Sequence, residues 1–179
     1  MKRLFVAIDI PKPVTDLLAS LDPHLRGVRW MRADQIHLTV SFLGSVGPIA
    51  EAALREKLTA IRFTAFFIPV VGIGTFPQKG KPNAIWAGVG DGHPQLFYVY
   101  KRVQEAALAA GLEPDLRSFH PHISFARCKE VSAETIRPFL KANADFDAGM
   151  IRVDSLSLYS SIPGPLGSAY THELEVKAA

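Results

Sequence analysis

The sequence predicts a domain in which β-strands and α-helices are interleaved and the second half resembles the first. Short runs of β-branched and aromatic residues, bounded by Gly and Pro, indicate strands, and the segments between them carry apolar residues at helical spacing. The chain has 179 residues, of which 48% are hydrophobic and 21% charged. This length suits one compact domain or two tightly joined lobes, and the composition favours neither a disordered nor a membrane protein.

Two strand–helix pairs are expected in the first third of the chain. Residues 3–10 have the composition of a strand, and the prolines that follow begin a helix with apolar residues on one face. A strand over 28–31 leads through a turn into a strand over 36–43, which carries the first motif and which Gly44 and Gly47 are expected to end. Pro48 then suits the first turn of a helix that extends to residue 61.

The rest of the chain repeats this alternation. Strands are predicted over 63–71 and 84–89, with a loop rich in Gly, Pro and Lys between them, and a helix follows over 94–110. After a turn around Pro114, a short strand over 120–125 precedes a helix over 132–140, for which Ser132 is the expected N-cap. Two final strands are predicted over 151–159 and 170–176.

Composition also limits the cellular context. The single cysteine, Cys128, cannot form an intramolecular disulfide or build a thiolate metal cage, and it is read as a small side chain rather than a reactive thiol. The apolar run 4–10 is short and contains Asp9, which fits neither a signal peptide nor a membrane span. We therefore expect a cytoplasmic protein and, since no exposed apolar interface is apparent, a monomer. The net charge of +3 is compatible with an anionic partner such as RNA.

The strand predicted over 36–43 carries a polar face that requires an explanation. Side chains alternate across a strand, so that one face holds His37, Thr39 and Ser41, and the other holds Leu38, Val40 and Phe42. A strand buries its apolar face, and the polar face is then directed toward solvent or a cleft.

The same pattern returns at His122 and Ser124, which again place an imidazole and a hydroxyl two residues apart with apolar residues between them. One such pair on a strand is common by chance, but both copies follow a helical segment and precede a helix. A duplicated strand–helix unit would bring His37 and His122 together across a pseudo-twofold axis. The sequence therefore predicts a symmetric cleft with two histidines.

This arrangement suits the cleavage of a cyclic phosphodiester. One group must take a proton from the attacking water and another must give a proton to the leaving ribose oxygen. The unperturbed pKa of imidazole, about 6.5, allows one histidine to be neutral and the other protonated near neutral pH. The hydroxyls of Thr39 and Ser124 would donate hydrogen bonds to non-bridging phosphate oxygens, and Arg127 would add a fixed positive charge. Arg127 is equally well explained as an ordinary surface residue.

These residues resemble a known family. His37–Val40 and His122–Phe125 look like the paired His-x-Thr/Ser-x motifs of the two-histidine (2H) phosphoesterase superfamily. The flanking sequences resemble bacterial and archaeal RNA 2′,3′-cyclic phosphodiesterases, also called 2′-5′ RNA ligases, over nearly the whole chain. The segments that carry this likeness are Arg3–Ile8, Trp30–Arg32, Phe42–Gly44, Phe119–His122 and Ala126–Arg127. Ser124 departs from the commonest pattern, which has threonine, but it keeps the hydroxyl.

The resemblance implies a bilobal α+β fold over residues 1–179, in which two antiparallel sheets with helices outside form the walls of a central groove. It further implies hydrolysis of RNA 2′,3′-cyclic phosphate ends to 2′-phosphate ends, with tRNA fragments among the candidate substrates and without a metal or cofactor. His37 would be the proton donor and His122 the proton acceptor, which the residues alone do not distinguish. Thr39, Ser124 and Arg127 would bind the substrate.

Other readings remain open. A zinc hydrolase is disfavoured, since neither motif has a carboxylate or cysteine at ligand spacing. A non-catalytic module that binds RNA ends or nucleotides, and reversible joining of RNA ends through a 2′-5′ linkage, would use the same groove. His120 shares strand parity with His122, and a structural role is favoured for it. The rings of Phe5, Trp86 and Tyr170 can stack on a base, although core packing is the more common role for such residues.

Overall fold

The computed structural model describes residues 1–91, 93–113 and 115–179, so that the turn predicted around Pro114 lies outside the described residues. The helices are α1 (Lys12–Ala19), α2 (Pro48–Thr59), α3 (Pro94–Ala109) and α4 (Ala133–Ala142), with a short 3₁₀ turn, η1, over Ala33–Gln35. The strands are β1 (Lys2–Asp9), β2 (Val28–Trp30), β3 (His37–Val46), β4 (Phe66–Val71), β5 (Ile73–Phe76), β6 (Ala84–Gly88), β7 (His122–Cys128), β8 (Asp147–Val153), β9 (Ser155–Ile162) and β10 (Ala169–Lys177).

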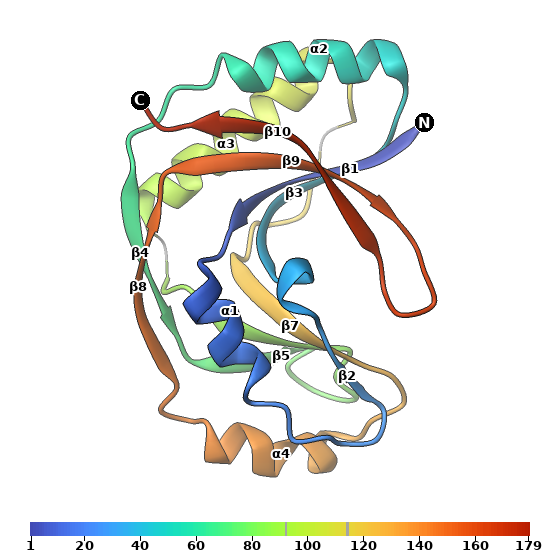
Figure 1. The fold of residues 1–179 in the computed structure, drawn as a ribbon, viewed down its shortest axis with the longest axis vertical. Helices are drawn as coiled ribbons and strands as arrows, with labels where there is room; N and C mark the ends of the chain where they lie inside the picture. The colour runs from blue at the N-terminus through green and yellow to red at the C-terminus, as the bar shows by residue number, and fades with distance from the viewer. Residues whose placement is uncertain (92, 114) are drawn as a thin grey trace.

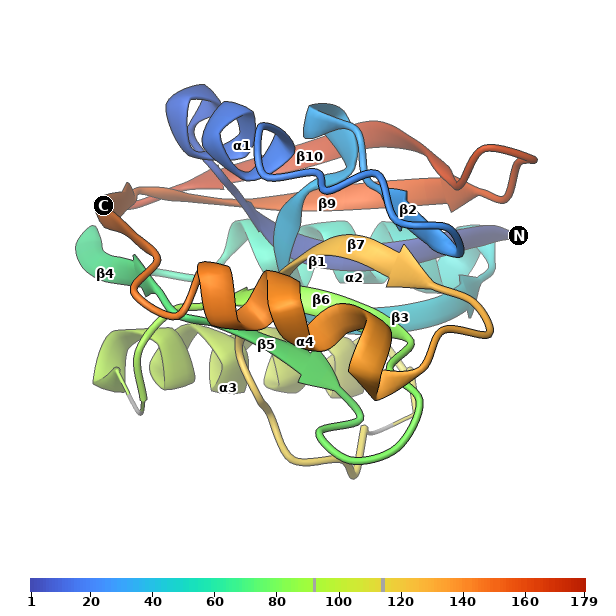
Figure 2. The same cartoon turned by 90° about the horizontal axis from the view of Figure 1, so that it is seen from below.

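The strands form two lobes that meet between β3 and β7. One lobe has the strand order β10-β9-β1-β3, and the other consists of β7 with β6 and β5 on one side and β2 on the other. All pairings in this sheet are antiparallel, and the two lobes are joined by the pair Leu38 and Ile123. A separate two-stranded sheet consists of β4 and β8. The predicted α+β fold with two duplicated lobes is confirmed (Figures 1 and 2).

The lobes are not consecutive halves of the chain. Helices α2 and α3 pack together beside the β1/β3 lobe, where Gln104 Nε2 of α3 donates a hydrogen bond to Ser41 Oγ of β3 at 2.8 Å. In the other lobe, Trp30 of β2 donates from Nε1 to the Leu18 carbonyl of α1 at 2.8 Å, and its ring centroid lies 5.4 Å from that of Phe139 in α4. Each lobe therefore takes helices from both halves of the chain.

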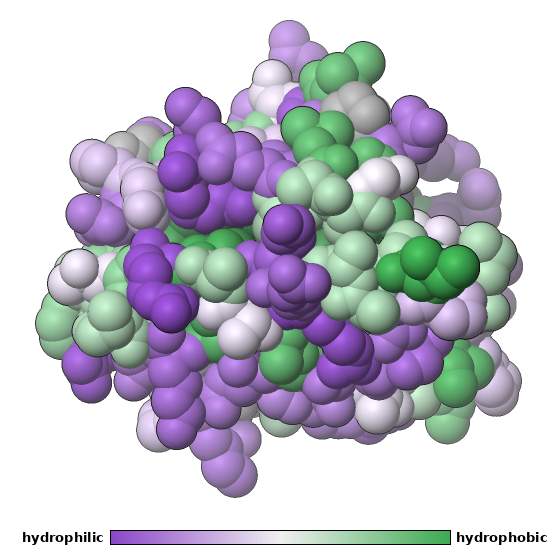
Figure 3. All heavy atoms as spheres, turned by 90° about the horizontal axis from the view of Figure 1, so that it is seen from above, coloured by the Kyte–Doolittle hydropathy of each residue, from purple (hydrophilic) through white to green (hydrophobic). Residues whose placement is uncertain are grey.

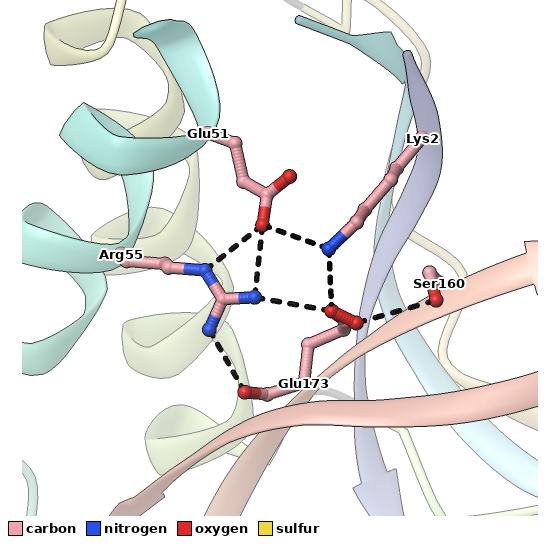
Figure 4. Close-up of polar contacts among 5 residues, drawn as sticks. All are labelled: Lys2, Glu51, Arg55, Ser160 and Glu173. Carbon is pink, nitrogen blue, oxygen red and sulfur yellow. Dashed lines mark hydrogen bonds and ion pairs between the residues drawn. The ribbon is translucent and has the colours of Figure 1, made fainter. Parts of the chain in front are cut away.

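A polar network holds α2 against strands β1 and β10 (Figure 4). Glu173 of β10 accepts from Lys2 Nζ at 2.8 Å and from Arg55 Nη2 at 3.1 Å, and the Glu173 carbonyl accepts from Arg55 Nη1 at 2.9 Å. Glu51 accepts from the same arginine at 2.8 Å and from Lys2 at 3.3 Å. Hydrogen bonds to the charged forms lower the pKa of both carboxyl groups. These four residues tie the first and last strands of the lobe to one helix.

Several predicted boundaries were wrong for identifiable reasons. The single strand expected over 151–159 is two strands that separate at Asp154, because β8 pairs with β4 whereas β9 pairs with β1. Strand β5 was not predicted, since its four residues include Gly74, over which the Trp86 ring packs. Strand β3 continues through Gly44, which has a positive φ of 72° and still pairs with Leu4. The glycine bends this strand instead of ending it.

The N-cap prediction for α4 is confirmed, because Ser132 Oγ accepts a hydrogen bond from the Thr135 amide at 3.2 Å. The surface viewed from the side of α2 is mainly hydrophilic, with smaller hydrophobic patches (Figure 3). Across the described ranges, no helix is long and apolar enough to cross a membrane.

Candidate active site

An irregularity in β3 decides which side chains reach the groove. Thr39 lies opposite Ala7 of β1, but Ser41 lies opposite Val6, so Val40 is an extra residue in the ladder. An extra residue reverses the alternation of side chains beyond it. Phe42 therefore lies on the same face as Thr39, and Ser41 lies on the opposite face.

The burial of the two residues agrees with this register. Ser41 is 4% exposed and is bonded to Gln104 of α3, whereas Phe42 is 59% exposed and its ring centroid lies 6.0 Å from that of Phe5. The predictions that Ser41 shares a face with the histidine and that Phe42 is buried were wrong. Strict alternation holds only for a regular strand, and the bulge follows from pairing with β1 that the sequence does not reveal.

Strand β7 has an irregularity at the corresponding position. Trp86 of β6 lies opposite Ser124, but Ile85 lies opposite Ala126, so Phe125 is the extra residue. This places Arg127 on the face of Ser124, although three residues separate them. The two motifs are thus alike in their backbone as well as in their sequence.

All five predicted site residues line one pocket, with a volume of about 360 Å³, between the two lobes. His37 and Thr39 enter it from β3, and His122, Ser124 and Arg127 enter it from β7. The predicted convergence of the motifs thus agrees with the structure, and Phe5, Gln35, Phe42, Phe76, Tyr100, Phe119 and Tyr170 complete much of the wall. The pocket combines apolar walls with a few polar groups, as small-molecule sites do.

His122 is held in one tautomer. Its Nδ1 lies 2.6 Å from the carbonyl oxygen of His120, and because a carbonyl only accepts, Nδ1 must donate. In the neutral ring, Nε2 is then unprotonated and can accept a proton. The ring packs against Phe76, at 4.8 Å between centroids. Burial lowers the pKa of His122, against the opposing effect of the His120 carbonyl, and the positive charge of Arg127 lowers it further.

His37 has a carboxylate neighbour instead. Its side chain is 9% exposed, and Nε2 lies 3.6 Å from Oδ1 of Asp9. Nδ1 is buried and has no hydrogen-bond partner among the residues that the structure describes. Burial lowers the pKa of His37, while the charge of Asp9 and the backbone of Gln35 raise it. The two histidines therefore differ in what stabilises their protonated forms.

Asp9 is a functional candidate that the sequence reading missed. It does not line the pocket; it lies behind His37, where Tyr159 donates a short hydrogen bond to Oδ1 and Ser157 Oγ donates to Oδ2 at 2.9 Å. His172 Nε2 lies 3.1 Å from the same serine hydroxyl. Burial and the hydrogen bond to Asp9 raise the pKa of Tyr159, which keeps it a donor. A charged residue within an apolar strand was the available signal.

His120 precedes β7, is exposed, and contributes its backbone carbonyl to the site. Phe5 is 4% exposed and packs in an aromatic group, whereas Tyr170 and Trp86 are half-buried. Burial raises the pKa of the Cys128 thiol, which disfavours the reactive thiolate.

The described side chains of the site do not form a metal-binding set. Within the described part of the chain, no three His, Cys, Asp or Glu side chains cluster as they would around a metal ion. The five predicted residues instead supply the pocket with two imidazoles, two hydroxyls and a guanidinium, and hydroxyls are poor zinc ligands. This set suits proton transfer and the binding of an anion.

Comparisons with known proteins agree with this site. A family model for LigT-like phosphoesterases matches residues 8–86 and 89–170. The RNA 2′,3′-cyclic phosphodiesterase of Aeropyrum pernix is 33% identical over 82% of this chain and 84% of its own length. The corresponding protein of Archaeoglobus fulgidus is 29% identical over 94% of this chain and 96% of its own length.

A solved structure is also similar over almost the whole chain. The crystal structure of Escherichia coli LigT complexed with 3′-AMP is 25% identical, with a TM-score of 0.79, and the match covers 99% of this chain and 98% of that chain. The resemblance to two-histidine phosphoesterases is thereby confirmed, and the chain belongs to the LigT-like phosphoesterase family.

Proposed function

We propose that this protein hydrolyses the 2′,3′-cyclic phosphate ends of RNA to 2′-phosphate ends by general acid–base catalysis without a metal. The observation that carries the proposal is the convergence of His37 and His122 on one pocket, each with a hydroxyl side chain two residues further along its strand. The names of the relatives support the substrate class, since they are RNA 2′,3′-cyclic phosphodiesterases.

The surroundings of the histidines support different roles for them. His122 donates from Nδ1 to a carbonyl, so Nε2 is available to take a proton from water. His37 lies beside the Asp9 carboxylate, which stabilises its protonated form and suits it to donate a proton. An anionic phosphate entering the pocket would raise the pKa of both rings and favour the protonated acid further.

The reaction then balances as one displacement. Water attacks phosphorus and gives its proton to His122, the bond between phosphorus and the 3′ oxygen breaks, and His37 protonates that oxygen. The product has a 2′-phosphate and a 3′-hydroxyl. Thr39, Ser124 and Arg127, which line the same pocket, would bind the non-bridging oxygens, on which the negative charge resides.

The test is hydrolysis of an RNA oligomer that ends in a 2′,3′-cyclic phosphate, in EDTA, with the position of the product phosphate assigned by phosphorus NMR. We expect a 2′-phosphate. His37→Ala and His122→Ala should each lower kcat by at least about 10²-fold, since positioned acids and bases contribute on that order, while the affinity for the product changes little. If the wild type shows no turnover and the two alanine variants lose affinity for the RNA end, the protein is a binding module. Formation of joined RNA ends would favour ligation.

We further propose that residues 1–179 act as one unit and that the protein is a cytoplasmic monomer, with tRNA fragments among its substrates. The exchange of helices between the lobes supports a single unit. Light scattering would detect an oligomer, and competition between a tRNA fragment and a short oligomer would measure the preference.

A further inference from the structure

Two arginines face each other beside the catalytic pocket. Arg29 of β2 and Arg127 of β7 are direct partners in the antiparallel ladder. Side chains at such positions lie about 4.5–5.5 Å apart at Cβ, and like charges directly opposite are destabilising. Neither guanidinium has a carboxylate partner among the described residues. A pair of this kind is stabilised when an anion lies between the two charges.

The pair lines a hollow of about 160 Å³ that continues from the catalytic pocket. The two spaces share Met31, Gln35, Arg127 and Tyr170. Arg127 lies at their junction, and Arg29 lies only in the outer hollow. No acidic side chain lines this hollow within the ranges that the structure describes. A chain that leaves the histidines in this direction passes Arg127 before it reaches Arg29.

The hairpin between β9 and β10 holds Arg29 in place. Arg29 Nη1 donates to the Leu166 carbonyl at 3.0 Å, and Gln35 Nε2 donates to the Ser168 carbonyl at 2.8 Å. Gly167, between these carbonyls, has φ +101°, and a Cβ there would lie 2.6 Å from Arg29 Nη1. The guanidinium is thus fixed by one of its five donors, and the others remain for a ligand. Such preorganisation reduces the entropy lost on binding.

We propose that Arg29, together with Arg127 at the junction, binds the phosphate on the 5′ side of the terminal nucleoside, while the cyclic phosphate of the same nucleoside lies between the histidines. The guanidinium of Arg127 has five donors and lines both spaces, so it can donate to both phosphates. Guanidinium groups match phosphate oxygens with paired hydrogen bonds. This site would make an RNA chain a better substrate than a nucleoside cyclic phosphate with a free 5′-hydroxyl. The inference rests on the proposed function for the identity of the group between the histidines.

The smallest pair of probes is a nucleoside 2′,3′-cyclic phosphate with and without a 5′-phosphate. In the wild type we expect kcat/KM to be about tenfold or more higher with the 5′-phosphate, since hydrogen bonds between charged groups are strong enough for that effect. Arg29→Gln should reduce this ratio to near one and leave the 5′-hydroxyl substrate unchanged. Arg29→Lys should keep part of the ratio. Arg26→Gln removes the same charge from an exposed residue outside the hollow and should keep the ratio of the wild type.

The proposal is overturned if the wild type does not prefer the 5′-phosphate, or if Arg29→Gln lowers the turnover of both substrates equally. Calorimetry of the two nucleoside 2′-phosphate products, one with and one without a 5′-phosphate, tests the same preference without catalysis. If the protein has no turnover but still binds the product with the 5′-phosphate more tightly than the other product, the proposed reaction is overturned and the phosphate site is supported. Equal affinity for the two products would overturn the phosphate site alone.

Discussion

Replacement of Asp9 by Asn tests whether the carboxylate behind His37 sets the proton affinity of that ring. The variant keeps the size of the side chain and an oxygen that can accept from Tyr159, and it removes one negative charge 3.6 Å from Nε2. Coulomb's law gives about 1 kcal/mol at this distance in water and about 5 kcal/mol at an effective dielectric constant of about 20. Because the Asp9 side chain is 44% exposed, the lower end of this range applies, at about 1–2 kcal/mol.

An energy of this size corresponds to about one pKa unit. Loss of the negative charge disfavours the imidazolium, so that the pKa of His37 should fall by about that amount. The assay is NMR titration of His37 in the free enzyme, together with the pH dependence of kcat/KM. If His37 is the acid, the limb on the alkaline side should move about one unit to lower pH.

Asp34→Asn is the matched control, because Asp34 has the weakest of the effects that raise the pKa of His37 and its side chain is 70% exposed. Its shift should be smaller than that of the Asp9 variant. An unchanged or raised pKa of His37 in Asp9→Asn would refute the reasoning. Movement of the limb on the acid side instead would show that His37 acts as the base.

Three further predictions follow from the site and the fold. The profile of kcat/KM against pH should be bell-shaped with its maximum below pH 6.5, because burial lowers the pKa of both His37 and His122 from that value; a maximum on the alkaline side of neutrality contradicts it. Ser124→Ala should lower kcat by about 10²-fold with little change in KM, as measured by steady-state kinetics, and Ser124→Thr should keep the activity. The pKa of Glu173 is lowered from 4.5, so its ion pairs stabilise the fold above that pH and are lost as the pH falls through the pKa of the folded state. The Glu173→Gln variant should therefore lose less stability on acidification than the wild type, as measured by thermal melting.

The residues that form the site were predictable because local pattern alone identifies them. Two strands with a histidine and a hydroxyl on one face are visible without any knowledge of pairing, and their repetition indicates a shared cleft. The same local signals predicted the four helices and the cap at Ser132. The fold class came from the resemblance to two-histidine phosphoesterases, with which the chain order of strands and helices agreed.

The parts that were missed depend on long-range pairing. Whether residues 151–159 form one strand or two is decided by two different partners, β4 and β1, that are distant in sequence. Asp9 could be identified as unusual within its strand, but its contact with His37 exists only because β1 and β3 are adjacent in the sheet. The orientations of Ser41 and Phe42 depend on a bulge, which follows from the register of the same pair of strands.

The bulges also explain how a duplicated site acquires a direction. Both motifs direct into the groove the residue three positions after the hydroxyl, which is Phe42 in the first motif and Arg127 in the second. The first end is thus apolar, with Phe5 beside Phe42, and the second is cationic. A substrate that runs past Arg127 toward Arg29 can pair its chain phosphates with guanidinium groups, which the Phe42 and Phe5 rings do not offer. The symmetry places the two histidines in equivalent positions, and the residues after the bulges, together with Asp9, make those positions chemically different.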